Sequence, residues 1–282
     1  MLKELIVSMR PKQWYKNLIL FVCLVFSANL FNVSMWYAII AAFVIFCILS
    51  GSDYTINDVI DRKKDREHPT KSKRPIAAGK LNVGSALFFA IVFIILSLYW
   101  AYTINLAFFG ISLVFFIAHT LYSSLLKKFV IVDVLTISVN FIIRAIAGCL
   151  AISVFISPWL IICTFLLALL LALGKRRMEL ILLGKKAEKH RNNLKEYSMA
   201  MLDQMINITA GALVISYSLY TFLADKIYLM FTIPFALYGI FRYLLLLRND
   251  GIGENPELLF KDLGMLICLI LWIIVIIFVF YI

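Results

Sequence analysis

The sequence predicts an all-α, polytopic membrane protein with nine transmembrane helices in one bundle. Of its 282 residues, 63% are hydrophobic and only 15% are charged, and the mean hydropathy is +0.96. Soluble domains are about half apolar and about a quarter charged. This composition excludes a water-soluble globular enzyme, a disordered chain and a secreted disulfide scaffold. Apolar stretches of about 20 residues, the length that crosses a bilayer, recur along the chain.

Nine apolar stretches are the expected spans, and three longer hydrophilic segments separate some of them. The expected spans are residues 17–31, 36–56, 83–102, 104–122, 129–151, 157–174, 205–224, 227–247 and 263–282. The longer segments are residues 57–82, 175–204 and 248–262. The first span is short unless its helix begins before Asn17. We expect residues 1–282 to form one integral membrane domain.

The positive charges predict the orientation. If the N-terminus is cytoplasmic, all of the 27 Lys and Arg residues except Lys226 and Arg144 fall in or beside cytoplasmic segments. We therefore expect a protein of the plasma (inner) membrane, with its N-terminus in the cytoplasm and its C-terminus outside. Attraction of basic juxtamembrane segments to anionic lipid accounts for part of the net charge of +11. The five cysteines lie in apolar stretches without CxxC spacing, which predicts no metal or disulfide role.

The most informative stretch, residues 57–79, reads NDVIDRKKDREHPTKSKRPIAAG. If the helix of the second span continues into it, Asn57, Asp61 and Asp65 recur at i, i+4 and i+8 on one face. Asp58 lies beside them. Like-charged carboxylates on one face repel one another, so solvent and neighbouring cations, or a bound divalent cation, must offset their charge.

A magnesium–diphosphate site is the more specific of these two interpretations. Oxygen ligands suit Mg²⁺, which bridges carboxylates to phosphate groups. His68 closes the turn before Pro69, and Lys71, Lys73 and Arg74 follow at once. Carboxylates would hold the metal, and the basic side chains would hydrogen-bond the remaining phosphate oxygens.

The acidic motif at the end of a second span, in a nine-span bundle, resembles the UbiA-type intramembrane prenyltransferase superfamily over essentially the whole chain. Finer features are similar to its decaprenyl-phosphate phosphoribosyltransferase branch. They are RPKQWYKN at 10–17, the segment 57–79, DV at 133–134 with Arg144, and LALGKRRMEL at 171–180. The resemblance implies an Mg²⁺-dependent transferase that moves 5-phosphoribosyl from phosphoribosyl diphosphate to a polyprenyl phosphate and releases diphosphate. It implies membrane lipids as surroundings and no nucleic-acid partner.

The segment after the sixth span departs from the superfamily's usual pattern. Members with aromatic acceptors carry a second acidic motif there, whereas residues 174–179 read GKRRME. Cations fit a site that also holds the ribose 5-phosphate and the lipid phosphate, which makes Lys175 and Arg176 candidates. The alternative is that these cations only anchor the end of a helix.

The fifth span carries polar residues on one face. Asp133, Asn140 and Arg144 recur at i, i+7 and i+11. Ionisable groups within a span face a partner or a polar cavity. Arg144 therefore either pairs with Asp53 or Asp133, or contacts a phosphate. The resemblance adds four substrate-binding candidates at the mouth and in the cavity of the site: Tyr122, Lys127, Lys16 and Asn17.

These interpretations predict one site with two sets of residues. The expected metal-binding and catalytic residues are Asn57, Asp61 and Asp65. The expected substrate-binding residues are Lys16, Asn17, Asp58, His68, Lys71, Lys73, Arg74, Tyr122, Lys127, Asp133, Arg144, Lys175 and Arg176.

Two rival functions remain. A prenyltransferase that moves a prenyl group from prenyl diphosphate to an aromatic acceptor predicts a second acidic cluster, which the sequence lacks. A carrier of polyprenyl phosphate or organic anions explains the basic face but not three carboxylates on one helical face.

Overall fold

The computed structural model has the predicted helical membrane architecture. It describes residues 1–67, 70–183, 194, 196–224, 226–249, 259 and 261–281, and these contain helices but no strand. Eight helices in this part of the chain are long and apolar enough to cross a membrane. The chain divides into two compact units, which are described separately: unit 1 is Met1–Leu125 with Ile143–Ile156, and unit 2 is Leu126–Ile142 with Ser157–Ile282.

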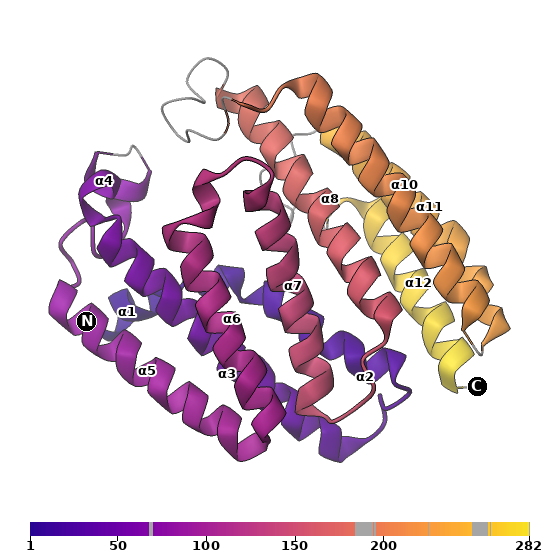
Figure 1. Ribbon diagram of the computed structural model, residues 1–282, viewed down its shortest axis with the longest axis horizontal. Coiled ribbons are helices and arrows are strands. Elements are labelled where there is room, and N and C mark those ends of the chain that lie inside the picture. Colours follow the sequence, from indigo (N-terminus) through magenta and orange to yellow (C-terminus); the bar gives the residue numbers. More distant parts are fainter. Residues whose placement is uncertain are drawn as a thin grey trace. The chain divides into compact units, whose positions relative to one another are not determined.

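Unit 1 is built around three membrane-length helices. Helix α3 packs against both α5 and α6, which appear in indigo to magenta in Figure 1. Asparagine side chains begin two of these helices, because Asn82 accepts the N–H of Gly84 and Asn105 accepts that of Phe108. The elements of unit 1 are α1 (Leu2–Ser8), the 3₁₀ helix η1 (Pro11–Phe21), α2 (Val22–Phe26), α3 (Val33–Ile60), α4 (Arg62–Arg66), the 3₁₀ helix η2 (Lys71–Lys73), α5 (Val83–Ile104), α6 (Leu106–Ser124) and the last part of α7 (Val132–Ala151).

The first expected span, residues 17–31, is not one long α-helix. It begins inside η1, an 11-residue 3₁₀ helix, and continues through α2, which has only 5 residues. Arg10, just before η1, has a left-handed backbone with φ of 52°. Because a 3₁₀ helix rises about 2.0 Å per residue, the two elements together extend roughly 30 Å, comparable to the hydrocarbon core. The expected count of nine spans is not confirmed by the described residues.

Gly148 in the last part of α7 permits the close helix contact that its residue type suggests. A Cβ at this position would lie 2.3 Å from the backbone oxygen of Leu20. We expect Gly148→Ala to lower the free energy of unfolding by about 1–3 kcal/mol, because a backbone atom must move to make room. Denaturant unfolding of the detergent-solubilised protein measures this change.

The matched control is Gly110→Ala in α6, because a Cβ there meets nothing within 4 Å. This variant should be as stable as the parent or up to about 1 kcal/mol more stable, since alanine favours a helix over glycine. Equal stability of the two variants would contradict the contact.

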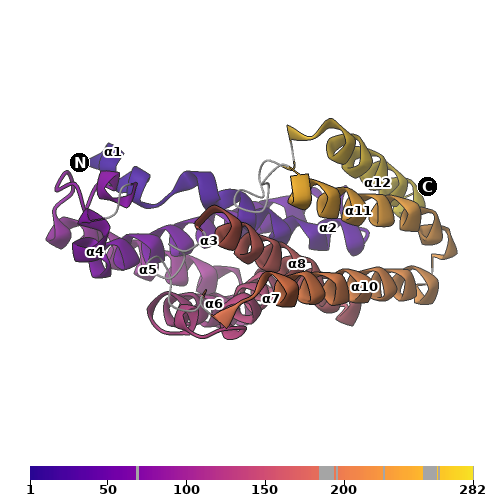
Figure 2. The ribbon, with the colours of Figure 1, turned by 90° about the horizontal axis from the view of Figure 1, so that it is seen from above.

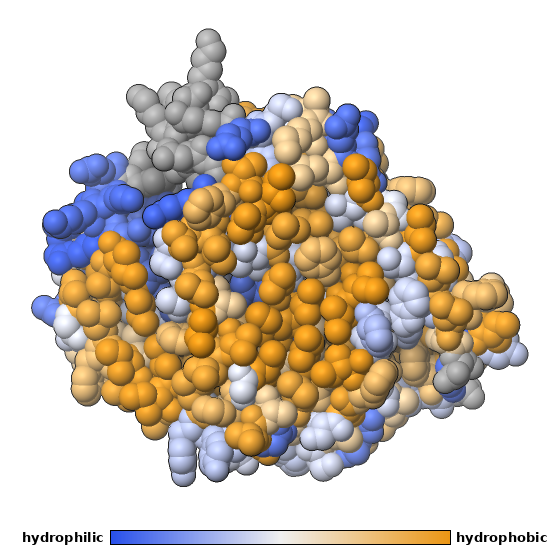
Figure 3. Space-filling view, viewed as in Figure 1, coloured by the Kyte–Doolittle hydropathy of each residue, from blue (hydrophilic) through white to orange (hydrophobic). Residues whose placement is uncertain are grey.

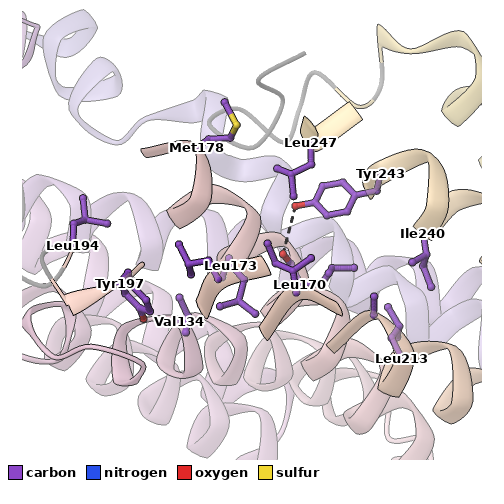
Figure 4. Packing of buried hydrophobic residues seen from close by; sticks show 14 of the residues in the cluster. Val134, Leu170, Leu173, Met178, Leu194, Tyr197, Leu213, Ile240, Tyr243 and Leu247 are labelled. Atoms are coloured by element: carbon purple, nitrogen blue, oxygen red, sulfur yellow. Dashed lines mark hydrogen bonds between the residues drawn. The ribbon is translucent and has the colours of Figure 1, made fainter. Parts of the chain in front are cut away.

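Unit 2 is a second group of helices, in which α8 packs against α10 (Figure 2). Its core gathers apolar side chains around Leu170, Leu173 and Leu213, and the hydroxyl of Tyr243 donates to the backbone oxygen of Leu170 at 3.4 Å (Figure 4). The elements of unit 2 are η3 (Leu126–Lys128), the first part of α7, α8 (Pro158–Leu183), α10 (Met199–Leu223), η6 (Ile227–Thr232), α11 (Ile233–Asn249) and α12 (Leu263–Tyr281).

The hydrophilic segment 175–204 is shorter than predicted. Helix α8 continues to Leu183, so residues 175–183 are helical, and Ser198 caps α10 by accepting the N–H of Met201. The extension of α8 has a physical reason, because residues 175–183 contain neither Gly nor Pro. Most of the rest of 175–204, and most of 248–262, lies outside the described residues.

The outer surface of the helices is suited to lipid. Hydrophobic residues, orange in Figure 3, cover most of the visible face, and hydrophilic residues gather over the end of unit 1 that carries α4. On α5, the large apolar side chains of Phe88 and Ile95 are 62% and 60% exposed. Such exposed apolar faces on helices of this length are expected of an integral membrane protein.

Candidate active site

The acidic motif lies where α3 gives way to α4. The sequence predicts one uninterrupted helix here, but α3 ends one residue before Asp61 and α4 begins one residue after it. The helical hydrogen bonds nevertheless continue. The N–H of Asp61 donates to the backbone oxygen of Asn57 at 2.9 Å, and the N–H of Asp65 donates to that of Asp61 at 2.9 Å. The predicted i, i+4, i+8 relation of the three residues is therefore retained.

Two carboxylates of the motif are buried and neutralised by arginines. Asp58 and Asp65 are 2% and 3% exposed. The Nη1 atom of Arg74 donates to both, at 2.9 Å to Asp58 and 2.7 Å to Asp65. Arg10 also donates to Asp58, and its guanidinium lies over the ring of Tyr54 at 4.8 Å from the ring centre. The structure thus brings together three predicted site residues and adds Arg10.

The donor atoms of the motif fit a magnesium ion in type. Mg²⁺ prefers oxygen ligands. Such an oxygen is available in the side chain of each of Asn57, Asp61 and Asp65. One guanidinium nitrogen shared between two buried carboxylates shows that this position needs positive charge, since buried carboxylates are costly without it. In the described parts of the chain, no three His, Cys, Asp or Glu residues are placed to hold a metal together.

Two further predicted site residues, Asn17 on the 3₁₀ helix η1 and Arg144 in the last part of α7, contact each other, a pairing that the sequence did not predict. Arg144 is 3% exposed, and its Nε donates to the side-chain oxygen of Asn17 at 2.8 Å. Its guanidinium lies over the ring of Phe115 at 4.6 Å. The amide of Asn17 also donates to the sulfur of Cys47 at 3.3 Å. Asn17 therefore orients the guanidinium of Arg144 inside unit 1.

A buried polar network that the sequence did not predict surrounds Asp53. Its carboxylate lies 2.6 Å from Nδ1 of His119 and accepts hydrogen bonds from the hydroxyls of Thr120, at 2.8 Å, and Ser123, at 3.3 Å. The ring of His119 meets the ring of Tyr54 edge-on at 5.4 Å. The guanidinium of Arg10 lies over the other contact surface of this network, the ring of Tyr54. The network therefore helps to position Arg10, which pairs with Asp58. The only signal in the sequence is an acidic residue within a span.

Unit 2 contains a buried ion pair between α7 and α8. Arg176 is 1% exposed and Asp133 is fully buried. The Nε of Arg176 donates to Asp133 at 2.7 Å, and its Nη1 donates to Glu179 at 2.7 Å. Tyr197 donates to the second oxygen of Asp133 at 3.0 Å and accepts the N–H of Ile131 at 2.7 Å. Burial and the nearby carboxylate of Asp133 raise the pKa of Tyr197, which keeps it a donor.

The next cation of α8, Arg177, makes an ion pair that is less buried. The Nε of Arg177 donates to Asp203 at 2.7 Å, and the side chain of Asp203 is 43% exposed.

The other predicted site residues are distributed between the two units. His68 lies outside the described residues. Lys71 and Lys73 are exposed, on η2. The half-buried predicted residues are Lys16, Asn57, Asp61, Arg74 and Tyr122 in unit 1, and Lys127 and Lys175 in unit 2.

Comparison with known proteins decides the family. The family model described as "UbiA prenyltransferase family" matches residues 17–270. The chain belongs to the UbiA prenyltransferase family. The resemblance predicted from the acidic motif is therefore confirmed.

Named relatives within the UbiA family support a narrower likeness. A decaprenyl-phosphate phosphoribosyltransferase of Mycolicibacterium smegmatis is 34% identical, over 95% of this chain and 90% of its own. One of Corynebacterium glutamicum is 32% identical, over 99% and 87%. A UbiA homologue from Archaeoglobus fulgidus bound to GPP and Mg²⁺ shares the fold, with a TM-score of 0.76, 21% identity and coverage of 99% of this chain and 100% of the homologue.

Proposed function

We propose that this UbiA-family transferase moves a 5-phosphoribosyl group from phosphoribosyl diphosphate to a polyprenyl phosphate and releases diphosphate. The observation that carries the proposal is the gathering of two buried carboxylates and two arginines at the acidic motif of unit 1. Such a motif suits a metal-bound diphosphate. The names of relatives at 34% and 32% identity favour the phosphoribosyl donor.

The acidic motif would bind the diphosphate of the donor. Asn57, Asp61 and Asp65 would hold Mg²⁺, which supplies positive charge to the leaving diphosphate when bound. Arg74, with Lys71 and Lys73 on η2, would donate hydrogen bonds to the phosphate oxygens. A diphosphate brings negative charge to a site where the guanidinium of Arg74 already lies, so the arginine can contact phosphate as well as carboxylate.

The reaction is a substitution at C1 of the ribose. An oxygen of the lipid phosphate forms a bond to C1 as the bond from C1 to the diphosphate oxygen breaks. The attacking phosphate is already ionised at neutral pH, so no general base is required. The protein must position two anions against each other, and basic side chains do this.

The remaining cations are assigned to the ribose 5-phosphate and the lipid phosphate. We assign Arg144, Lys16, Asn17 and Tyr122 of unit 1, and Lys127 and Lys175 of unit 2, to the binding of these phosphates. Since Arg176 donates to Asp133 and Glu179 in the structure, its part in the proposal is to hold α8 against α7. The distribution of Lys and Arg along the sequence supports a site on the cytoplasmic face of the plasma membrane, with the N-terminus inside and the C-terminus outside.

Transfer in detergent with alternative substrates tests the proposal. We expect a product when the protein receives phosphoribosyl diphosphate, polyprenyl phosphate and Mg²⁺. We expect none with a prenyl diphosphate and an aromatic acid. Chelation of the metal should abolish transfer, and added Mg²⁺ should restore it. Activity only with the prenyl diphosphate would replace this proposal with the aromatic-acceptor reaction.

A further inference from the structure

A cavity beside the acidic motif is not used by the proposed reaction. It has a volume of about 310 Å³ and lies in unit 1, where α3 ends and α5 begins. Its lining consists of three cations and three apolar residues: Arg62, Lys63, Arg66, Val59, Ile60 and Val83. One side of the cavity is therefore basic and the other is apolar.

Two of the three lining cations, Lys63 and Arg66, are turned away from Asp61, whereas Arg62 lies about 40° around the helix from Asp58. The backbone hydrogen bonds of Asp61 and Asp65 keep the helical register through the junction of α3 and α4. At about 100° per residue, Lys63 and Arg66 lie well over 90° around the helix from Asp61. One short segment thus presents Asp61 on one face, and Lys63 and Arg66 on another.

The three cations are not used to neutralise the acidic motif. Arg10 and Arg74 make the ion pairs of Asp58 and Asp65 in the described part of the chain, and none of these pairs involves the three cations. Arg66 is oriented by a hydrogen bond from its Nε to the backbone oxygen of Ala77 at 3.1 Å. The Nε of Arg62 is buried and, among the described residues, has no hydrogen-bond partner. The cluster therefore keeps net positive charge.

The apolar side of the cavity is continuous with the surface of membrane-length helices. Val59 and Val83 pack on the small core of Leu5, Ile76, Leu81 and Ala86. Ile60 is 66% exposed. Both α3 and α5 are long and apolar enough to cross a membrane, so we expect their ends at this cavity to lie at the level of lipid headgroups.

We infer that this cavity binds the headgroup of an anionic phospholipid. The phosphate is held by Arg62, Lys63 and Arg66, and the upper part of the acyl chains packs on Ile60 and the two valines. A phospholipid fits both sides of the cavity, whereas a free phosphate would use only the cations. The bound lipid holds the basic face of the segment whose other face carries Asp61 and Asp65.

Native mass spectrometry of the purified full-length protein in detergent, titrated with phosphatidylglycerol, tests this inference. The test variant is Arg62→Gln/Lys63→Gln. The control, Lys12→Gln/Lys80→Gln, removes two exposed cations of the same unit outside the cavity. We expect the test variant to bind the first phosphatidylglycerol roughly tenfold or more weakly, and the control to change by less than about twofold. Phosphatidylcholine with the same acyl chains, whose choline offsets the phosphate charge, should bind the parent more weakly than phosphatidylglycerol does.

Three results would overturn the inference. They are equal weakening in both variants, no weakening in either, and displacement of the lipid by an excess of inorganic phosphate. The variant Arg62→Lys/Lys63→Arg keeps both charges and should retain binding, and thermal unfolding without added lipid shows whether each variant is folded. No substrate is present in these measurements, so their outcome is independent of the transfer reaction.

Discussion

Asp61→Ala should lower the rate of phosphoribosyl transfer by roughly a hundred- to a thousandfold, the size expected when a group that stabilises developing charge is lost. Asp61 lies at the junction of α3 and α4, one helical turn from both Asn57 and Asp65. Its loss removes the central oxygen ligand of the proposed metal site. Steady-state transfer at saturating donor and a series of Mg²⁺ concentrations measures the effect.

The matched control is Glu67→Gln, an exposed carboxylate that directly follows α4. It removes the same charge from the same segment and should leave transfer within about twofold of the parent, since exposed charges interact weakly. Thermal unfolding of both variants without substrate separates a catalytic loss from a folding defect. Equal activity of Asp61→Ala and Glu67→Gln in folded protein would exclude Asp61 from the metal site.

Asp133→Ala should destabilise the protein by about 3 kcal/mol, because it leaves the buried guanidinium of Arg176 without its main counter-charge. Glu179 remains hydrogen-bonded to Arg176 in this variant. The expected loss of stability is therefore near the lower end of the roughly 3–5 kcal/mol that follows when a buried ion pair is broken. Unfolding by denaturant in detergent measures the difference. Adding Arg176→Met to Asp133→Ala should recover much of the loss, because the uncompensated charge is then gone.

The control for this prediction is Asp203→Ala, which breaks another ion pair of unit 2. The pair of Arg177 with Asp203 has the same 2.7 Å separation, but Asp203 is 43% exposed. Its loss should cost less than about 1 kcal/mol. Similar losses for the two variants would show that burial does not decide the strength of these pairs.

The sequence predicted those features that depend on local pattern. Hydropathy predicted the long helices, because a bilayer demands about 20 apolar residues for each span. The spacing of Asn57, Asp61 and Asp65 predicted their helical register, which the backbone hydrogen bonds retain across a break in the helix. The contact of Arg74 with the acidic motif involves residues only 9 and 16 positions apart.

Pairings between distant residues could not be predicted. Arg10 and Asp58 are 48 positions apart, Asp133 and Arg176 are 43 apart, and Asp53 and His119 are 66 apart. The packing of the helices decides which polar groups on different spans contact each other. A single sequence does not reveal helix packing. For the same reason the sequence left Asp53, Asp133 and a phosphate open as partners of Arg144, while in the structure Arg144 donates to Asn17.

The fate of each part of the donor tests the central claim most directly. The donor is phosphoribosyl diphosphate with one isotope in the ribose and another in the β-phosphate, incubated with Mg²⁺ and polyprenyl phosphate. We expect the ribose label to enter the lipid phase and the β-phosphate label to remain in water as diphosphate. Entry of both labels into the lipid phase would contradict transfer at C1 of the ribose. So would entry of neither label when the protein is shown to be folded.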